Sequence, residues 1–305
     1  MMNTDVFGHN KFKIKAEPYL LIAPAVFLML LVIAYPTVRN FYLSFFKWDL
    51  AGQDKPFIWF DNYKEIILDE KFLEVIINTF VWTVSCVVLQ MSLGLLLAVI
   101  VDGSRKSVQG FLKSAFLLPW IIPTIVTGSI WQWMLQADLG ILNIGLKLAG
   151  IIRDPVLWLA DEKYAMASCI MVNVWKGFPF WFIMLLAGLQ SLSKDQIESA
   201  VVDGAPGWKV FFHIKIPHLL PIISVTAVLT TIWTLNAADL FFILTKGGPG
   251  IATTTLAYHS YLFGFQYYKF GKSATVSIIS MFLVFIISLP YLRMTMRQLR
   301  EGGAE

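Results

Sequence analysis

Long runs of apolar residues, each ended by charged residues, divide the chain into six segments. The runs cover about 18–38, 75–101, 114–137, 164–192, 217–245 and 273–292. Two of them contain a single charged residue, Lys176 in the fourth run and Asp239 in the fifth. About 20 apolar residues in a helix cross a hydrocarbon core of roughly 30 Å. The pattern therefore predicts six transmembrane helices, the first of which is longer than the apolar region of a signal peptide.

The composition agrees with this pattern and excludes an ordinary soluble enzyme. Hydrophobic residues make up 57% of the chain and charged residues 14%, whereas soluble domains average about 45–50% and about 25%. The net charge of +4 needs no nucleic acid, because basic clusters beside membrane spans are attracted to anionic lipids. The predicted fold class is all-α, a polytopic membrane protein.

Lys and Arg near the ends of the spans indicate an orientation. They are in excess on the side that holds both termini, and cytoplasmic loops carry such an excess. We therefore expect a cytoplasmic tail at 1–17, a transmembrane domain at 18–292 and a second cytoplasmic tail at 293–305. The sequence thus predicts a multi-pass protein of the cell membrane with both termini in the cytoplasm.

Two prolines in the third run predict a distorted helix. Pro119 and Pro123 each remove a backbone hydrogen bond. In lipid this loss is tolerated only where neighbouring helices or a wet cavity satisfy the freed carbonyl groups. We therefore expect a kinked helix in the interior.

The cytoplasmic segment between the fourth and fifth runs, residues 193–217, predicts a helix-turn-helix. Ser193 with Gln196 three positions later matches a capping box at a helix start. Gly204 is typical of the position after a helix end, and Pro206 of the first residue of the next helix. Pro217 is then expected to stop that second short helix.

The second short helix presents large aromatic side chains. Trp208, Phe211 and Phe212 form its apolar face, and Lys209 and Lys215 its polar side. The segment either packs on the protein's own cytoplasmic ends or docks on a partner, since exposed apolar patches on a membrane protein's rim fit a partner's groove. The pattern alone leaves both interpretations open.

The same segment resembles a motif of permease subunits of binding-protein-dependent ABC importers. Glu198-Ser199-Ala200, three residues, Gly204, nine residues, Ile214, one residue and Ile216-Pro217 follow the family's E-A-A-x3-G-x9-I-x-L-P pattern, with Ser199 and Ile216 as small departures. The stretches 173–180, 186–190 and 244–250 are similar to the carbohydrate, maltose-type branch of that family. The resemblance covers about residues 18–295.

This resemblance implies a transmembrane subunit of an ATP-driven sugar importer in a prokaryotic inner membrane. It implies three kinds of partner: a cytoplasmic ABC ATPase dimer, a second and different permease subunit, and an extracytoplasmic solute-binding protein. The motif segment is then the coupling helix that contacts the ATPase. The expected coupling residues are Glu198, Ser199, Ala200, Asp203, Gly204, Trp208, Phe212, Ile214 and Pro217.

No catalytic or metal-binding constellation is recognisable in the chain. Gly271-Lys272-Ser273 ends like a phosphate-binding loop, but Gln266 stands where the first glycine is required. His213 and His218 are off the spacing that places two ligands on one helix face. We therefore expect a non-enzymatic subunit with no cofactor of its own, ATP and magnesium being bound by the partner ATPase. Cys86 and Cys169 are expected to be packing residues.

Charged side chains inside membrane spans are costly and indicate function. Counting helical rise places Lys176 and Asp239 at different depths, which disfavours a direct ion pair unless a helix is broken, and favours two side chains that face a wet cavity. Sugars are bound by aromatic stacking and by amide and carboxylate hydrogen bonds. The candidate residues of a substrate path are Trp131, Trp133, Asn173, Lys176, Trp233, Asn236 and Asp239.

These features support one function and leave alternatives. The first is a permease that gives a sugar an alternating-access path driven by ATP. The second is the same kind of importer carrying a phosphorylated polyol such as glycerol phosphate. An ion-coupled secondary transporter that uses Lys176 and Asp239 as a relay is the rival from another class, and a membrane-embedded enzyme is the least supported.

Overall fold

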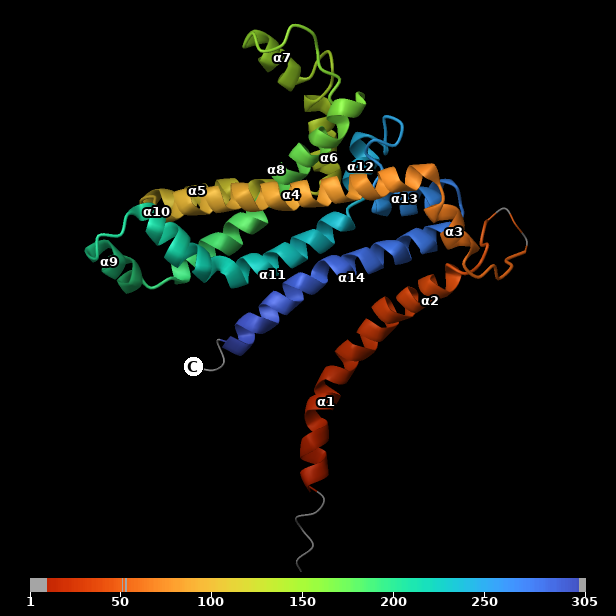
Figure 1. Ribbon diagram of the computed structural model, residues 1–305, viewed down its shortest axis with the longest axis horizontal. Helices are drawn as coiled ribbons and strands as arrows, with labels where there is room; N and C mark the ends of the chain where they lie inside the picture. The colour runs from red at the N-terminus through yellow and green to blue at the C-terminus, as the bar shows by residue number, and fades with distance from the viewer. Residues whose placement is uncertain (1–9, 51, 53, 302–305) are drawn as a thin grey trace, which may run out of the picture.

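The computed structural model describes residues 10–50, 52 and 54–301, and this part of the chain is mainly helical (Figure 1). In place of strands, its described residues hold two isolated bridges, Phe46 with Phe57 and Asp49 with Lys269. The first half contains α1 (Asn10–Met29), η1 (Leu30–Ala34), α2 (Tyr35–Leu43), α3 (Asp61–Ile67), α4 (Glu70–Asp102), α5 (Lys106–Ile121), α6 (Thr124–Met134) and α7 (Ile141–Leu148). The second half contains α8 (Glu162–Ser191), α9 (Lys194–Val202), α10 (Gly207–Val210), η2 (Phe211–Lys215), α11 (Ile216–Leu235), α12 (Asp239–Leu244), α13 (Leu256–Tyr261), η3 (Leu262–Gln266) and α14 (Phe270–Glu301).

Five helical segments of the described chain are long and apolar enough to cross a membrane, and a bent pair of helices raises the number to six. The five are Pro18–Leu43, Glu70–Asp102, Glu162–Ser191, Gly207–Leu235 and Phe270–Ile287. The predicted fold class, a polytopic all-α protein, is therefore confirmed. The helices extend into the predicted tails, since α1 begins at Asn10 and α14 ends at Glu301. The outermost parts of those tails, residues 1–9 and 302–305, lie outside the described residues.

The packing centre of the fold is the contact between α4 and α8. Gly94 of α4 lies directly against Trp181, and Gly177 of α8 lies against the side chain of Gln90. Because both helices place a glycine at the contact, their backbones approach closely, as small residues allow in membrane bundles. The surrounding cluster is fully or almost fully buried and includes Val101, Trp181, Phe182, Leu185 and Leu219. Helix α11 packs against α4, α8 and α14.

The two cysteines lie in a second buried cluster. Cys86 of α4 and Cys169 of α8 are fully buried and free, and both belong to one apolar cluster with Trp82 and Phe241. The prediction that they are packing residues is confirmed.

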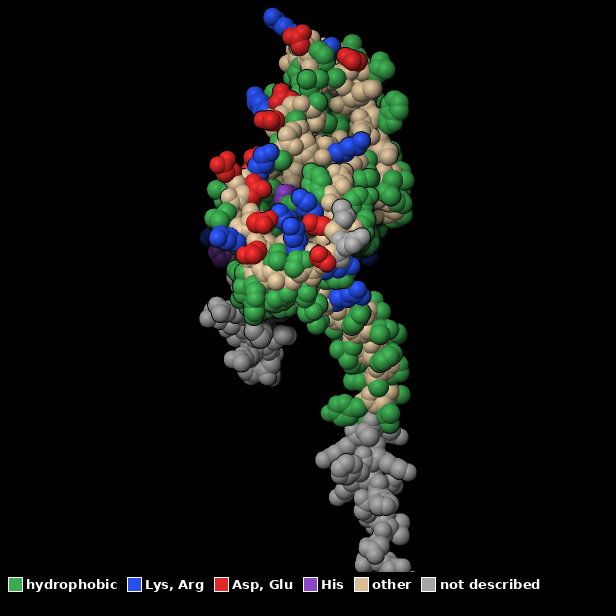
Figure 2. All heavy atoms as spheres, turned by 90° about the vertical axis from the view of Figure 1, so that its right-hand side faces the viewer, with side chains coloured by type: hydrophobic (Ala, Val, Ile, Leu, Met, Phe, Trp, Pro, Cys, Tyr) green, Lys and Arg blue, Asp and Glu red, His purple; other side chains and the backbone are tan. Residues whose placement is uncertain are grey.

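Helix α1 stands away from the bundle, whereas α2 contacts α14 (Figure 1). None of the apolar window of Pro18–Leu43 is buried, compared with half of the window of α8. Figure 2 shows mostly hydrophobic side chains along the described part of α1 and α2, and charged side chains gathered at the end of the bundle that holds α3. There Lys272 donates to Glu65 at 2.5 Å, and this hydrogen bond lowers the pKa of Glu65.

The third apolar run forms two helices, which corrects the expectation of one kinked helix. The axes of α5 and α6 differ by 94°. Pro123 has no N–H, and Ile122 before it takes an extended conformation, φ −68° and ψ 127°, because a following proline disfavours the helical one. The pair contacts the bundle through α5 against α8 and α6 against α12, so the expected interior position is met in part for this chain taken alone. In the pair, only Pro119, Thr127 and Gly128 are buried among the described residues.

The predicted helix of the fifth run is wrong at both of its ends. Pro217 does not stop the second short helix, because α10, η2 and α11 form one continuous helical segment from Gly207 to Leu235. The Ile216 N–H bonds to the Phe211 carbonyl, a π-type turn that precedes the proline at the start of α11. At the other end, the helix stops at Leu235 and a separate helix, α12, starts at Asp239.

The close approach of α4 and α8 generates the first prediction. A methyl group at Gly94 would lie 2.6 Å from Trp181 Cβ and 2.9 Å from the Phe182 backbone nitrogen. We expect Gly94→Ala to lower the free energy of unfolding by about 1–3 kcal/mol through overpacking. Thermal unfolding of the purified protein in detergent, followed by tryptophan fluorescence, measures this as a lower midpoint.

Gly110→Ala is the matched control. Gly110 is also a helical glycine, but a Cβ there meets nothing within 4 Å. This variant is expected to leave the midpoint unchanged or to raise it, since Ala favours a helix by up to about 1 kcal/mol. Equal midpoints for both variants would contradict the close helix contact.

Candidate functional site

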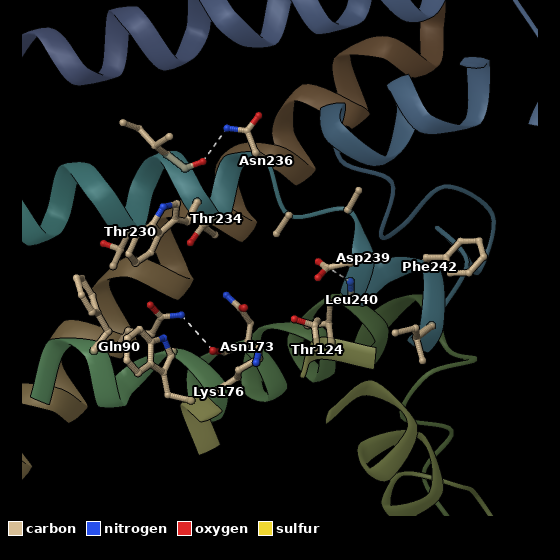
Figure 3. A pocket seen from close by; sticks show the side chains of 18 of the residues that line it. Gln90, Thr124, Asn173, Lys176, Thr230, Thr234, Asn236, Asp239, Leu240 and Phe242 are labelled. Atoms are coloured by element: carbon tan, nitrogen blue, oxygen red, sulfur yellow. Dashed lines mark hydrogen bonds between the residues drawn. The ribbon is translucent and has the colours of Figure 1, made fainter. Parts of the chain in front are cut away.

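A cavity of about 800 Å³ lies where two helices are interrupted (Figure 3). Residues of α4, α8 and α13 line it. Further lining residues come from α5 and α6, on either side of the first break, and from α11 and α12, on either side of the second break. Its polar lining residues are Gln90, Thr124, Asn173, Lys176, Thr230, Thr234, Asn236 and Asp239. Its aromatic lining residues are Trp120, Phe180, Trp233, Phe242 and Tyr261.

The break after α11 brings two polar side chains, Asn236 and Asp239, to the cavity. The Asn236 side chain donates to the Ile232 carbonyl at 2.8 Å and so covers the last turn of α11. Asp239 starts α12, and its Oδ1 accepts from the Leu240 N–H at 3.0 Å. A carboxylate at a helix start is stabilised by the free N–H groups there. The break therefore provides a position at which Asp239 is tolerated within an apolar run.

Lys176 projects from α8 toward the other break. Its ammonium group donates to the Ile122 carbonyl at 2.5 Å, between α5 and α6. No ion pair joins Lys176 to Asp239 in the described part of the chain, where the two ion pairs are Lys215 with Asp102 and Lys272 with Glu65. This agrees with the expectation that Lys176 and Asp239 face a cavity instead of pairing directly.

Three aromatic rings form one wall of the cavity. The ring centroids of Trp120 and Phe180 are 5.9 Å apart, and those of Phe180 and Trp233 are 5.0 Å apart. Trp233 is 51% exposed. Within the lining, Gln90 Nε2 also donates to the Asn173 carbonyl at 3.1 Å. The cavity thus combines an aromatic surface with amide, hydroxyl and carboxylate groups, which suits a ligand with both apolar faces and hydroxyl groups.

The structure brings together five of the seven candidates for a substrate path. Asn173, Lys176, Trp233, Asn236 and Asp239 line the cavity. Trp131 does not, because it packs against Trp175 with ring centroids 5.7 Å apart. Trp133 does not either, since it is 71% exposed and borders a separate hollow near α7. The 94° bend carries α6 away from the axis of α5 and so separates these two tryptophans from the rest.

The lining residues that sequence reasoning missed include Gln90, Trp120 and Phe180. Gln90 stands in the middle of an uncharged run, where a polar side chain in lipid is a recognisable signal. Trp120 and Phe180 carried no such signal, because aromatic residues are frequent in every run of this chain.

The second candidate surface is formed by α9, α10 and η2 at the opposite end of the bundle (Figure 1). Helix α9 ends as predicted, since Gly204 has φ +76° and its N–H bonds to the Val201 carbonyl. Ser193 is the N-cap residue, but its side chain makes no capping hydrogen bond, so the predicted capping box is wrong. Pro206 precedes the first residue of α10 and does not begin it.

This surface exposes its large apolar side chains. Trp208 is 58% exposed and Phe212 61%, and Val202 in the neighbouring turn is 85% exposed. Glu198 and Asp203 are also exposed, whereas Ala200 and Ile214 are half-buried. The segment therefore does not hide its aromatic face on the described part of its own chain.

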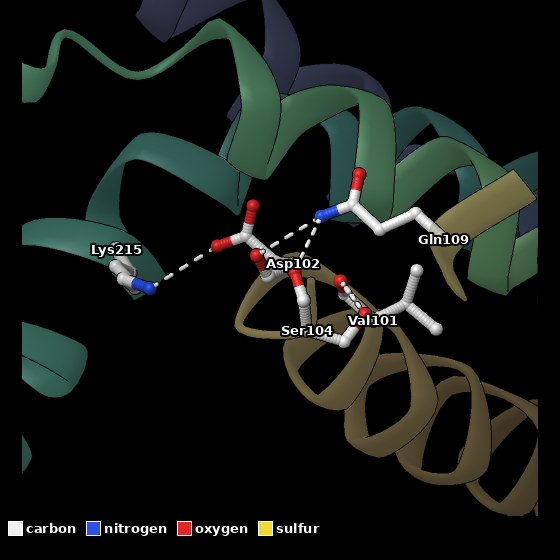
Figure 4. Close-up of polar contacts among 5 residues, drawn as sticks. All are labelled: Val101, Asp102, Ser104, Gln109 and Lys215. Carbon is white, nitrogen blue, oxygen red and sulfur yellow. Dashed lines mark hydrogen bonds and ion pairs between the residues drawn. The ribbon is translucent and has the colours of Figure 1, made fainter. Parts of the chain in front are cut away.

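A polar network holds the segment to the end of α4 (Figure 4). Lys215 Nζ lies 3.4 Å from Asp102 Oδ2. Gln109 Nε2 donates to the carbonyl groups of Ser104 at 3.0 Å and Asp102 at 3.5 Å, and so fixes the turn between α4 and α5. Because both charged groups are partly exposed, the ion pair contributes at most about 1 kcal/mol. Its consequence is positional, since it joins η2 to α4.

Comparison with known proteins agrees with this arrangement. The family described as "binding-protein-dependent transport system inner membrane component" matches residues 90–294. The trehalose/maltose transport system permease protein MalF of Thermococcus litoralis is 32% identical over 96% of this chain and 98% of its own length. The sulfoquinovosyl glycerol transport system permease protein SmoG of Agrobacterium fabrum is 33% identical over 90% and 88%.

The fold is also similar to a solved structure. A chain of a bacterial ABC transporter involved in the import of the acidic polysaccharide alginate superposes with a TM-score of 0.80 at 23% identity, covering 94% of this chain and 98% of that chain. The similarity extends over nearly the whole length of both chains, so it concerns the complete helical arrangement.

The geometry of the cavity generates a prediction about solvent access. We expect Trp233→Cys and Asn236→Cys to react with a charged, water-soluble methanethiosulfonate reagent, because both positions are exposed in the cavity. Mass spectrometry of the purified protein measures the modification. The native Cys86 and Cys169 are fully buried and are not expected to contribute.

Leu185→Cys serves as the control for reactivity. Leu185 lies in the same bundle but is fully buried in the core. We expect Leu185→Cys to react at least about tenfold more slowly than the two cavity variants, because thiol reactivity follows exposure. If Trp233→Cys and Asn236→Cys reacted as slowly as Leu185→Cys, the cavity would not be accessible to water.

Proposed function

Because this chain belongs to the family of binding-protein-dependent transport system inner membrane components, we propose that it is a permease subunit of an ATP-driven sugar importer. It forms half of a translocation path in the membrane and transmits the action of a cytoplasmic ATPase to that path. The single observation that carries this proposal is the cavity between two helix breaks, which a continuous helix connects to an exposed aromatic segment.

The lining of the cavity favours a neutral, polyhydroxylated cargo. Among the described residues that line it, the charged ones are one cation, Lys176, and one anion, Asp239, so the local charge is balanced. Phe180 and Trp233 offer ring faces for a sugar, and Asn173 and Asn236 offer amide groups. The trehalose/maltose permease among the relatives supports a neutral saccharide.

An anionic cargo is the second candidate within the same class. The relative named for sulfoquinovosyl glycerol favours it. A phosphorylated polyol such as glycerol phosphate is a cargo of this anionic kind. An anion prefers a net basic site, and the carboxylate of Asp239 opposes this. The balance of Lys176 and Asp239 therefore favours the neutral cargo.

The segment formed by α9, α10 and η2 is the proposed coupling element. Its exposed Trp208 and Phe212 are of the type that anchors an interface, Glu198 provides a charged docking contact, and Gly204 provides the tight bend. Helix α11 continues from this segment to the cavity without interruption. ATP and magnesium are bound, and ATP is hydrolysed, by the partner ATPase.

The remaining partners and the orientation follow from the same proposal. A second, different permease subunit completes the path, and an extracytoplasmic solute-binding protein delivers the sugar. The excess of Lys and Arg places the α9–α10 end and both termini in the cytoplasm.

The coupling proposal predicts a loss of ATPase binding when the exposed anchors are removed. We expect Trp208→Ala to weaken copurification of the ATPase by the equivalent of about 2 kcal/mol or more, as for an interface tryptophan. Gly204→Trp adds a strain of about 1–2 kcal/mol, because the residue has φ +76°. Together with Glu198→Ala, these variants are expected to lower ATP-driven uptake in reconstituted vesicles.

The matched control is Trp133→Ala, which removes another exposed tryptophan from α6, away from the coupling segment. It is expected to leave ATPase binding intact. Normal association and uptake in Trp208→Ala, Gly204→Trp and Glu198→Ala would refute the coupling assignment. Uptake that collapses with an uncoupler at constant ATP would instead indicate an ion-coupled transporter.

The cargo proposal predicts which substrates the complex carries. Vesicles that contain the complex and its binding protein are expected to take up maltose or trehalose in preference to sn-glycerol 3-phosphate. Asp239→Asn removes the one anion of the described lining, and we expect it to shift this preference toward glycerol phosphate by roughly tenfold, or about 1.4 kcal/mol.

Asp161→Asn is the control for the removal of a carboxylate. Asp161 caps the start of α8 outside the cavity, and asparagine retains that capping function. Its substrate preference is expected to equal that of the unmodified protein. Preferential uptake of glycerol phosphate by the unmodified complex would favour the anionic cargo.

A further inference from the structure

The hydrogen bond between Lys176 and the Ile122 carbonyl connects a charged side chain of the cavity to a break in the backbone. The ammonium group reaches from the middle of α8 to the interval between α5 and α6. Figure 3 shows Lys176 beside Asn173 on α8, with Thr124 of α6 nearby. The bond therefore joins two walls of the cavity.

The Ile122 carbonyl needs such a donor because the break removes its helical one. In a straight helix this group would accept the N–H of the residue four positions later. Here Pro123 holds Ile122 in an extended conformation, and α6 starts anew at Thr124. An unsatisfied carbonyl group inside a membrane costs several kcal/mol. A hydrogen bond from a cation is the stronger kind of replacement.

Lys176 is itself held on a rigid support. The next residue, Gly177, lies against the Gln90 side chain, where any Cβ would come within 2.3 Å of Nε2. The same Nε2 donates to the Asn173 carbonyl, one turn before Lys176. This part of α8 is therefore fixed against α4, and Lys176 extends from a fixed base.

The position of α6 also determines that of α12. Gly128 of α6 lies against Ile243 of α12, with a hypothetical Cβ only 2.9 Å from Ile243 Cγ2. Asp239 begins the same short helix. A change in the angle between α5 and α6 would therefore move α12, and with it Asp239 in the cavity.

We propose that Lys176 is a positioning residue: its bond to the Ile122 carbonyl holds the 94° bend between α5 and α6 and so shapes the cavity before any cargo binds. This inference rests on the proposed function for its importance to transport, but its geometry does not depend on the identity of the cargo. It differs from a direct role of Lys176 in binding the cargo, which would leave the bend unchanged when the ammonium is removed.

The experiment measures the bend directly. Spin labels are attached to Phe111→Cys on α5 and Trp133→Cys on α6, which are 73% and 71% exposed. The full-length chain, coexpressed with its partner subunits, is placed in lipid nanodiscs without cargo, and the distance between labels is measured by pulsed electron paramagnetic resonance. Straightening of the bend would lengthen this distance by up to about 10 Å, at the helical rise of about 1.5 Å per residue.

The expected result is a longer and broader distance distribution in Lys176→Met and a nearly unchanged one in Lys176→Arg, whose guanidinium can still donate to the carbonyl. Lys163→Met, which removes a lysine from the first turn of the same helix, is the matched control and is expected to change nothing. An unchanged distance in Lys176→Met would overturn the proposal, whatever happens to transport.

A second variant keeps the test decisive if Lys176→Met fails to fold. Pro123→Ala removes the restriction that holds Ile122 extended, so that the Ile122 carbonyl can accept the N–H of Val126 as in a continuous helix. In this background, Lys176→Met is expected to fold and to cause no further change in the distance. An additional change of several Å in the double variant would also overturn the proposal. Loss of transport with the bend intact would point to cargo contact alone, so this inference and the proposed function fail in distinguishable ways.

Discussion

The requirement that every backbone polar group in a membrane be hydrogen-bonded governs this fold. Uninterrupted helices meet it within a single segment, and α4 and α8 do so over 33 and 30 residues. A helix can stop inside the membrane only where other groups take over its carbonyl and N–H groups. Both interruptions in the bundle, after Ile121 and after Leu235, open onto the same cavity. The cavity is therefore the place where the chain tolerates irregular backbone, and the polar side chains are gathered there for the same reason.

Two helices connect this cavity with the exposed aromatic segment. Helix α4 carries Gln90 beside the cavity and Asp102 at the ion pair with Lys215. The segment from Gly207 to Leu235 begins in α10 and ends at the second break. A helix transmits displacement along its axis because its hydrogen bonds are stiff, so a force applied near Trp208 reaches Asn236 without passing through a loop. The π-type turn at Phe211–Lys215 is what makes this continuity compatible with Pro217.

Much of this arrangement could be predicted from the sequence, and the parts that could not have physical reasons. The apolar runs predicted the spans, and Gly204 predicted the end of α9, because both signals are local. The prediction that Pro217 ends the second short helix was wrong. In sequence, a proline near the start of a helix looks like a proline that follows a helix end, and the π-type turn before it leaves no sequence signal. The bend at Pro123 was foreseen as a kink, but its angle depends on a donor 54 positions away in α8. Trp131 and Trp133 do not line the cavity for the same reason, because their placement follows from that angle.

Lys176 and Asp239 show how the cost of a charge inside a span and the cost of a helix break offset one another. A cation and an anion in an apolar environment are each expensive, and so is each helix break. Here Lys176 donates to a carbonyl group freed at one break, and Asp239 accepts an N–H at the start of the helix that follows the other. Each charge is thus stabilised by the backbone of a break, and each break by a charge, so neither group needs the other as an ion-pair partner. Because each charge is held by the backbone of a different break, both side chains line the cavity without closing it by a direct ion pair.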